Sequence, residues 1–271
     1  MAKQRISANQ VYVGVTSSNG QVLTSNGTVA YWANSSPISV SDTKWKYRLL
    51  RCDFEGANND TSTFNYVGFV PVGLSNNAII STSLAKFGLS SLLCAGGAAG
   101  TKVQCAITLP TNIGTSNFTL EGWVYPTSFT NNSFPGIFDL ALSTTVRVGL
   151  YIASSTTVGF RLDSTTNTLT TSTIGINLNA WNHIAIERVN GSITLYVNGV
   201  SAGSYAYTTS ILNTWILYIG STVDGYPLQG NIDDVRMTIG NTVYGSAFSG
   251  SVPSAALPIG PYVSFNNGPI L

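Results

Sequence analysis

Few side chains in this sequence could do acid–base or nucleophilic chemistry. His183 is the single histidine, and it lies in a strand-like stretch two residues after Trp181. A structural role fits that setting better than catalysis. The Gly-x-Ser-x-Gly pattern at 199–203 falls in a predicted strand rather than at a strand-to-helix turn, so it does not predict a nucleophile elbow. The glycine-rich run at 96–100 is not followed by Lys and Ser or Thr, as a phosphate-binding loop requires.

Carboxylates are also scarce in arrangements that suit hydrolysis. A glycosidase needs two carboxylates that face each other across the scissile bond. The glutamates of this chain, Glu55, Glu121 and Glu187, are widely separated in the sequence. We therefore expect no enzymatic activity, unless carboxylates that are distant in the sequence converge in a cleft.

The composition indicates an all-β protein. Of its 271 residues, 44% are hydrophobic and only 8% are charged, against roughly 25% charged residues in an average soluble domain. The surface must therefore consist largely of Ser, Thr, Asn and Gly, which suit short strands joined by turns. The longest apolar runs are too short to span a bilayer, and we expect no membrane insertion.

Short runs of alternating apolar and polar residues predict strands along most of the chain. Two Asn-Gly pairs, at 190–191 and 198–199, predict tight turns on either side of a strand over 193–197. No window has a useful length of helical periodicity, so many short strands predict a sandwich or jelly roll. The other predicted strands cover 118–125, 145–152, 158–162, 181–189, 200–207, 215–219 and 232–239.

The two ends of the chain differ from this body. Residues 1–40 predict an arm of short hairpins, with strands at 11–16, 21–23 and 28–32 and turns at 18–20 and at Asn26-Gly27. Hairpins this short cannot bury a core alone and need a partner. Residues 259–271 carry prolines and predict an extended tail. The predicted organisation is thus 1–40 arm, 41–258 sandwich and 259–271 tail.

Charge is distributed unevenly, although the net charge is only +1. Residues 1–51 hold six basic residues and one acid, a net charge of +5. Such an arm could dock on an acidic protein surface or on nucleic acid, or the charges could be scattered over the surface. The run from Lys44 to Arg51 alternates cations with aromatic residues or leucine, which fits an edge strand guarded by cations better than a nucleic-acid face. We do not expect nucleic acid to be a partner.

The three cysteines, Cys52, Cys94 and Cys105, form neither a disulfide framework nor a zinc motif. Apolar residues lie within two positions of each cysteine, which favours buried free thiols. A bridge between Cys94 and Cys105 remains an alternative.

Six short motifs follow one another between residues 49 and 258. They are LLRCDFEG at 49–56, KFGLSSL at 86–92, FTLEGWV at 118–124, WNHIA at 181–185, LYVNG at 195–199 and GNIDDVR at 230–236. In order and spacing they resemble the laminin-G-like, concanavalin-A-like jelly rolls. The resemblance implies an antiparallel β-sandwich in which 86–92 forms a strand. Glucanases of this fold carry Glu-x-Asp-x-x-Glu on one strand, and that signature is absent here.

The resemblance also implies ligands. Laminin-G-like and pentraxin-like sandwiches often bind calcium at one rim, for which Asp224, Asp163 and Asp139 are the candidates; otherwise we expect no cofactor. A glycan would need exposed aromatic rings beside amides and hydroxyls. Tyr226, Phe129 and Phe134 in loops are the candidates, and the alternative for each is a loop anchor.

A narrower resemblance concerns the setting of the protein. Residues 238–258 and 20–32 are similar to segments of bacteriophage virion proteins, and no apolar run of a signal peptide follows MAKQRISANQ. Both features favour a virion structural protein, a capsid decoration or head-fibre protein or a tail-fibre component. It would assemble in the host cytoplasm, act outside the cell and adhere to host-surface glycans. The alternative is a soluble carbohydrate-binding, lectin-like module.

The arm would attach this protein to other virion proteins. Phage projections are often trimers, so a homotrimer is expected. The residues predicted to make the attachment are Lys3, Arg5, Tyr12, Tyr31 and Trp32.

Overall fold

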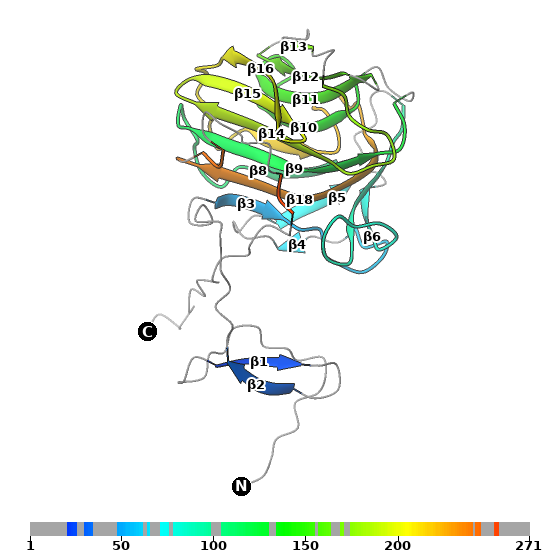
Figure 1. The fold of residues 1–271 in the computed structure, drawn as a ribbon. Coiled ribbons are helices and arrows are strands. Elements are labelled where there is room, and N and C mark those ends of the chain that lie inside the picture. The colour runs from blue at the N-terminus through cyan, green and yellow to red at the C-terminus, as the bar shows by residue number, and fades with distance from the viewer. Residues whose placement is uncertain are drawn as a thin grey trace. The chain divides into compact units, whose positions relative to one another are not determined.

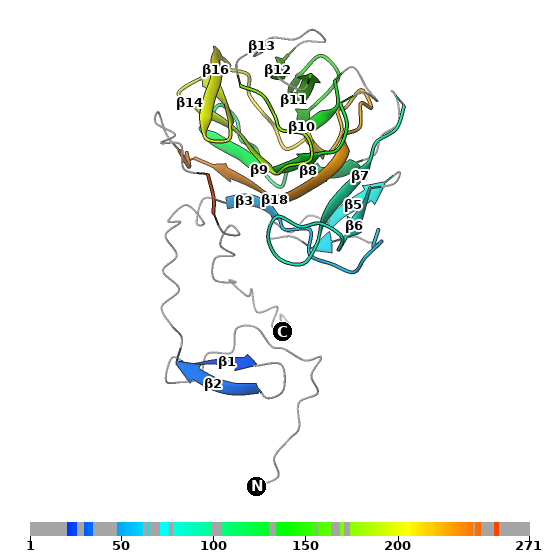
Figure 2. The same cartoon turned by 45° about the vertical axis from the view of Figure 1, so that its right-hand side comes forward.

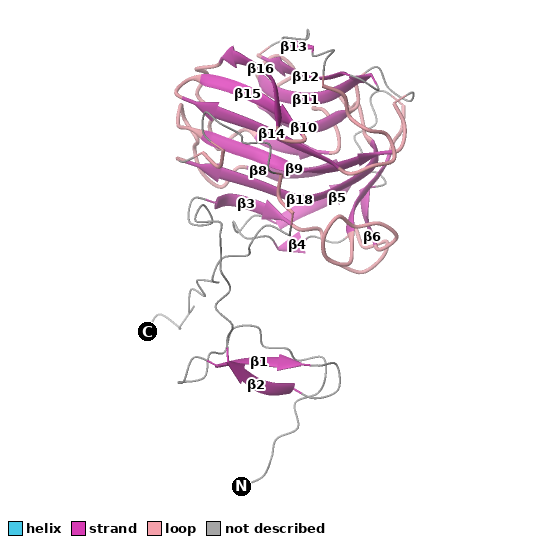
Figure 3. Ribbon diagram, viewed as in Figure 1, coloured by secondary structure: helices cyan, strands magenta, loops and turns pink. Residues whose placement is uncertain are grey.

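A computed structural model of the chain describes residues 21–25, 30–34, 48–61, 64–65, 71–75, 78–98, 104–129, 134–154, 157–163, 169–170, 174–240, 242–244 and 252–254. These residues form strands, turns and loops and no helix (Figure 3). None of them therefore forms a helix long and apolar enough to cross a membrane. The chain divides into two compact units, Lys44–Leu257 and Met1–Thr43 with Pro258–Leu271.

Two antiparallel sheets make up the larger unit (Figure 1; Figure 2). The first, here the β9 sheet, has the order β16-β15-β14-β9-β18-β7-β6, and β3 also pairs with β18. The second, here the β10 sheet, has the order β13-β12-β11-β10-β17-β8-β5-β4. The predicted antiparallel sandwich of the jelly-roll kind is confirmed.

The strands of the β9 sheet are β3 (Arg48–Cys52), β6 (Ala78–Ser81), β7 (Ser91–Ala95), β9 (Phe118–Pro126), β14 (Asn182–Val189), β15 (Ser192–Val197), β16 (Val200–Ala206) and β18 (Gln229–Ile239). The strands of the β10 sheet are β4 (Phe64–Asn65), β5 (Pro71–Ser75), β8 (Gln104–Thr108), β10 (Gly136–Ala141), β11 (Arg147–Ser154), β12 (Thr157–Leu162), β13 (Leu169–Thr170) and β17 (Ile216–Ile219).

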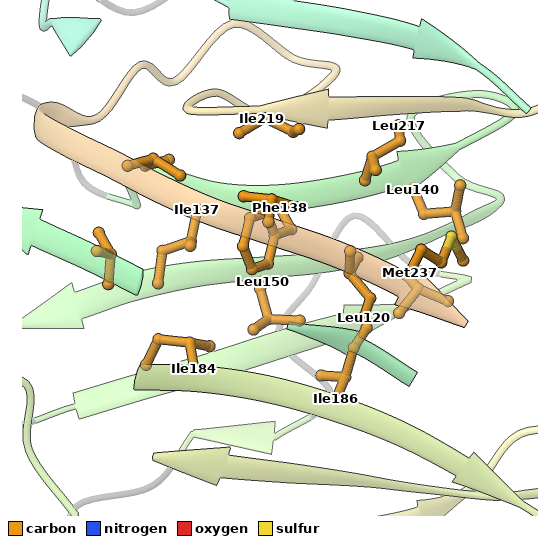
Figure 4. Close-up of a cluster of buried hydrophobic side chains, with 14 of the residues drawn as sticks. Leu120, Ile137, Phe138, Leu140, Leu150, Ile184, Ile186, Leu217, Ile219 and Met237 are labelled. Carbon is orange, nitrogen blue, oxygen red and sulfur yellow. The ribbon is translucent and has the colours of Figure 1, made fainter. Parts of the chain in front are cut away.

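The hydrophobic core lies between the two sheets (Figure 4). Alternate residues of each strand point into it, such as Leu120 of β9 and Phe138 and Leu140 of β10, all fully buried. Burying one such side chain stabilises the fold by about 1.5–3 kcal/mol. Gly122 makes room for this packing, since a Cβ there would lie 3.0 Å from Cζ of Phe138.

The predicted three-stranded meander is confirmed. Strand β15 pairs with both β14 and β16, and the two Asn-Gly pairs form the connecting turns. Asn190 and Gly191 have φ angles of 50° and 77°, and Asn198 and Gly199 have 49° and 82°. Positive φ at both central residues is what a type I′ turn requires, and Asn and Gly tolerate it best.

Two local predictions need correction. The stretch 86–92 is not one strand, because residues 82–90 form a loop and β7 begins only at Ser91. The loop is held by the Asp233 carboxylate, which accepts hydrogen bonds from the backbone N–H groups of Lys86 and Phe87 at 2.8 and 3.1 Å. Strand β10 was not predicted at all, although it is central to its sheet.

Two further predictions concern an edge strand and the cysteines. Strand β3 lies beside β18, outside the main path of its sheet, which agrees with the edge strand predicted around Arg51. The three cysteines are buried free thiols, as predicted. Burial raises the pKa of the Cys94 thiol to about 12, which keeps it protonated.

The smaller unit contains one described hairpin, in which β1 (Gln21–Ser25) pairs with β2 (Ala30–Asn34). Leu23 lies opposite Trp32 and Thr24 opposite Tyr31. The hairpin predicted around Asn26-Gly27 is therefore confirmed. The strand predicted at 11–16 and the tail at 259–271 lie outside the described residues.

Candidate functional site

The outer face of the β9 sheet, which points away from the core, is unusually rich in functional side chains. Along β9 the core residues Leu120 and Val124 alternate with Thr119, Glu121, Trp123 and Tyr125, which therefore share the opposite face. On the neighbouring strand β14, His183 pairs with Trp123 and Glu187 with Thr119. Paired residues lie on the same side of a sheet, so both strands contribute to one surface.

A buried ion cluster lies at the centre of this face. Nε and Nη2 of Arg236 donate to Oε1 of Glu121 at 2.8 and 2.6 Å. Nε2 of His183 lies 3.1 Å from Oε2 of Glu121, and the Tyr244 hydroxyl donates to the same oxygen. Burial by itself raises the pKa of Glu121, but Arg236 and then His183 and Tyr244 outweigh it and lower the pKa to about 2. Glu121 is thus a carboxylate at neutral pH.

Residues 242–244 lie over this cluster. The backbone N–H of Val243 donates to Oγ1 of Thr119 at 3.1 Å, and that of Tyr244 donates to Oε1 of Glu187 at 2.9 Å. Glu187 also accepts a 2.8 Å hydrogen bond from the Thr119 hydroxyl. Burial raises the pKa of Glu187. The structure thus brings Glu121 and Glu187 to adjacent strands, but both are fully buried and bonded to the segment above them.

Next to the ion cluster lies a group of aromatic side chains, here called the aromatic patch: Phe87, Trp123, Tyr125 and Trp181. The rings of Tyr125 and Trp181 are 5.5 Å apart at an angle of 64°, and both residues are only half-buried. Trp123 contacts the edge of Phe87 and is 5% exposed. Its indole N–H has no hydrogen-bond acceptor in the described part of the chain.

The loop at 82–90 covers one side of the aromatic patch. The Lys86 ammonium lies 3.8 Å from the ring centroid of Trp123, a cation–π contact. Asp233 holds the backbone of this loop, and burial raises the pKa of Asp233 to about 7. On the same strand as Asp233, Asn231 lies opposite Tyr125 in the register of β18 and β9, and its buried amide donates to Oγ of Ser91 at 3.0 Å.

The aromatic patch was not predicted, although the sequence holds a signal for it. In 118–125 the residues in step with Thr119 and Glu121 include Trp123 and Tyr125. Large aromatic residues in step with polar ones lie on the outer face rather than in the core. Trp181 shares the face because it precedes His183 by two residues.

The β10 sheet carries a second buried ion cluster on its own outer face, with Arg147 at the centre. Nε and Nη2 of Arg147 donate to the two oxygens of Asp139 at 3.2 and 2.7 Å, and Nη1 donates to Asp224 at 2.5 Å. Burial raises the pKa of Asp139 to about 6, against the opposing effect of Arg147. Gly149 leaves the space for this pair, since a Cβ there would lie 3.0 Å from Nε of Arg147.

The structure gathers the three predicted calcium ligands around Arg147. Asp139 and Asp224 bind its guanidinium, and Asp163 accepts a 3.0 Å hydrogen bond from its backbone N–H. Asp163 also accepts from the hydroxyls of Tyr207 and Thr209. Among the described residues, no group of three or more His, Cys, Asp or Glu side chains has an arrangement that could hold a metal ion. Calcium binding stays a prediction.

The predicted glycan-binding residues lie in different surroundings. Phe134 packs against Tyr151 with ring centroids 5.3 Å apart, and Arg161 lies over the Phe134 ring. Tyr226 is half-buried and its carbonyl accepts a hydrogen bond from the N–H of Gly136. Phe129 packs against the hydrophobic core.

The predicted attachment residues are mostly outside the described structure. Lys3, Arg5 and Tyr12 lie outside the described residues, and Tyr31 and Trp32 lie in β2. Their role stays a prediction.

Comparison with known proteins relates this architecture to sugar-active proteins. The family model described as the concanavalin A-like lectin/glucanases superfamily matches residues 99–239. No curated protein matches the sequence. The fold of the chain is therefore related to that of glycosidase domains.

Two solved structures show the likeness. A sialidase from Trypanosoma rangeli is 12% identical with a TM-score of 0.54, over 71% of this chain and 30% of the sialidase. Domain 4 of an extracellular GH43 arabinanase from Geobacillus stearothermophilus, solved in complex with arabinotriose, is 18% identical with a TM-score of 0.51. That match covers 71% of this chain and 92% of the domain. The chain thus spans less than a third of the sialidase, and at these identities the likeness concerns the fold alone.

Proposed function

The chain belongs to the concanavalin A-like lectin/glucanases superfamily, and from that premise we propose that it is a non-enzymatic carbohydrate-binding protein. The glycan would bind at the aromatic patch on the outer face of the β9 sheet. The observation that carries the proposal is the pair of half-buried rings, Tyr125 and Trp181, beside the polar side chains of the same face.

The chemistry of the patch suits a sugar. Sugars present apolar C–H faces that pack on aromatic rings, together with hydroxyls that need hydrogen-bond partners. Tyr125 and Trp181 offer the rings, and they combine an apolar body with a polar group. The Tyr125 hydroxyl offers both a donor and an acceptor. The arabinotriose complex of the similar arabinanase domain supports a short oligosaccharide as the class of ligand.

The state of the Glu121 and Glu187 carboxylates supports binding without hydrolysis. A glycosidase needs one protonated and one ionised carboxyl group in contact with the scissile bond. The pKa of Glu121 is lowered to about 2, so it cannot serve as the acid near neutral pH. Residues 242–244 lie over both Glu121 and Glu187 and bond to them. Neither Glu121 nor Glu187 is therefore open to a substrate.

Glycan arrays followed by calorimetry test the proposal. The wild-type protein is expected to bind one class of oligosaccharide, and Trp181→Ala to weaken that affinity about tenfold or more, the size of a binding hot spot. Phe134→Ala is the matched control, because it removes a half-buried ring that packs on Tyr151 of the β10 sheet. An affinity lost in Phe134→Ala but kept in Trp181→Ala would move the site to the other sheet. No binding to any glycan would overturn the proposal.

We also propose the setting that the sequence resemblance implies, a structural component of a bacteriophage virion. The hairpin β1–β2, in a compact unit separate from the jelly roll, supports an attachment arm of residues 1–40. Other virion proteins would be the partners, and a trimer the oligomer. The protein would act outside the cell, as a capsid decoration or head fibre or as a tail fibre.

Immunogold electron microscopy of the source virions, with antibody against residues 49–258, tests this setting. Label over the head would indicate capsid decoration, and label at the tail tip or fibres would indicate host recognition. Absence of label from every particle would contradict the virion proposal. A soluble carbohydrate-binding module would then be the better description.

A further inference from the structure

Strand β16 forms one end of the β9 sheet and differs from every other described edge. It pairs with β15 on one side and has no strand on the other side among the described residues. Its residues are mostly exposed, with Val200 at 53% and Tyr205 at 41%. In Figure 1 it is the yellow-green strand at the upper margin of the sheet. Such an edge presents unpaired backbone N–H and C=O groups to any chain that can pair with them.

The other edges of the two sheets are protected. Strands β13 and β4, at the ends of the β10 sheet, are two residues long. The edge of β6 is covered, because Ile80 exchanges backbone hydrogen bonds with Asn59 and Asp60 at 2.8 and 3.0 Å. Strand β3 has five residues, two fewer than β16. Short length, coverage and cations are the usual means by which proteins prevent edge pairing.

Strand β16 has neither coverage nor charge. Its sequence, VSAGSYA, contains no charged residue and no proline over seven residues. One irregularity exists, because the register with β15 shifts at Ala202. A bulge of this kind bends a strand locally, and Gly203 next to it has a φ of 141°, but Ser204, Tyr205 and Ala206 stay in register with β15. This segment is long enough to pair with a second strand of equal length.

We propose that β16 pairs antiparallel with β16 of a second copy of this chain. A strand pairs with itself in the antiparallel sense about a two-fold axis, the commonest symmetry of oligomers. Because β16 has no charge and the whole chain carries only +1, two copies meet without repulsion. A pairing centred on Ser204 places Tyr205 opposite Gly203 of the partner subunit. A glycine leaves its face of the strand open, and a cross-strand aromatic ring covers it.

This pairing joins two β9 sheets into one continuous sheet. A two-fold axis perpendicular to the sheet keeps the outer faces of both copies on the same side. If the proposed glycan site is correct, the dimer displays two aromatic patches toward the same surface, which increases avidity for a multivalent glycan. The pairing itself does not depend on the glycan proposal, because it rests on the backbone of β16.

The test compares the solution masses of the full-length wild type and Ser204→Lys by size-exclusion chromatography with light scattering. Lysine at this edge is expected to prevent pairing and to halve the mass. A wild-type dimer of 28.6 kDa chains becomes a monomer. If the N-terminal arms also join chains into a larger assembly, the mass of that assembly falls by the same factor. The control is Thr108→Lys, which adds the same charge to an exposed residue of the interior strand β8 and leaves the mass unchanged.

Two outcomes overturn the proposal. One is a monomeric wild type at concentrations up to about 100 μM, since dimers that form with Kd near 1 μM are fully populated there. The other is a wild-type oligomer of any size whose mass Ser204→Lys leaves unchanged while the thermal unfolding of the variant stays cooperative. If Ser204→Lys fails to fold, Tyr205→Ser replaces it, because the ring opposite Gly203 of the partner subunit is lost with no added charge.

Discussion

The two buried ion clusters have opposite compositions. On the β9 sheet one carboxylate, Glu121, is surrounded by three donors: a guanidinium, an imidazole and a hydroxyl. On the β10 sheet one guanidinium, that of Arg147, is held between two carboxylates. The central side chains of both clusters, Glu121 and Arg147, are fully buried.

The pKa values of the central carboxyl groups in the two clusters are shifted in opposite directions. The surplus of donors lowers the pKa of Glu121 to about 2, whereas burial raises the pKa of Asp139 to about 6. Burial disfavours the charged form in both places, so the balance of neighbouring charges decides the direction. The β9 cluster therefore fixes a charged carboxylate under residues 242–244, whereas the β10 cluster contains a carboxyl group whose pKa is raised to about 6.

Loss of the cation at the β9 cluster is expected to have the largest effect. Arg236→Met leaves the Glu121 carboxylate buried without its main counter-charge, and a broken buried pair typically costs about 3–5 kcal/mol of unfolding free energy. Urea unfolding at pH 7 measures the loss. In the double variant with Glu121→Gln the carboxylate that lost its counter-charge is also removed, so part of the stability should return. Additive losses in the double variant would show that the two side chains do not act as a pair.

The two clusters should contribute to the free energy of unfolding with opposite dependence on pH. The folded-state pKa of Glu121 lies below its ordinary value of 4.5, so its contribution is present above pH 4.5 and is lost as the pH falls toward 2. The expected loss is about 3 kcal/mol. The folded-state pKa of Asp139 lies above its ordinary value of 3.8, so its contribution is lost as the pH rises from 3.8 through 6.

Unfolding free energies between pH 2 and pH 8 measure both contributions. Glu121→Gln should flatten the profile below pH 4.5, and Asp139→Asn should flatten it between pH 4 and pH 6. If Asp139→Asn instead changes the slope below pH 4, the pKa of Asp139 is not raised in the folded state and the prediction is wrong.

The smallest expected effect concerns residues 242–244, which lie over the Glu121 cluster. Tyr244→Phe removes the hydroxyl that donates to Glu121, and a hydrogen bond to a charged group contributes about 1.5–3 kcal/mol. Tyr226→Phe is the matched control, since its backbone rather than its hydroxyl makes the described hydrogen bonds. Thermal unfolding of both variants measures the difference. Equal melting temperatures for the two variants would show that Tyr244 does not fasten the segment to the sheet.

The fold could be predicted from the sequence where the signal is local. The Asn-Gly turns at 190–191 and 198–199 fix their strands, because only a few residue types tolerate the required φ angles. Strand β10 was missed, because its sequence GIFDLA is buried along its whole length and shows no alternation of burial. The loop at 82–90 was mistaken for part of a strand, because its shape depends on Asp233, far along the chain.

The candidate site was only partly predictable, for a related reason. Asp139, Asp224 and Asp163 were named as candidate ligands, and they do gather in space, but around Arg147, which nothing in their spacing indicates. The glycan candidates were sought in loops, whereas the half-buried pair Tyr125–Trp181 lies at the ends of two adjacent strands. Its members are 56 positions apart, and only the register of β9 and β14 brings them together.

The sequence by itself determined the all-β class, the sandwich, the hairpins and the buried free thiols, because composition, alternation and turn residues act over a few positions. The tertiary structure decided which carboxylates are paired, which aromatic rings are open to a ligand and which edge strand is unprotected. These properties depend on contacts between residues that are far apart in the chain, and the free energy of each contact depends on the charges and the burial around it. Local sequence holds no record of those surroundings.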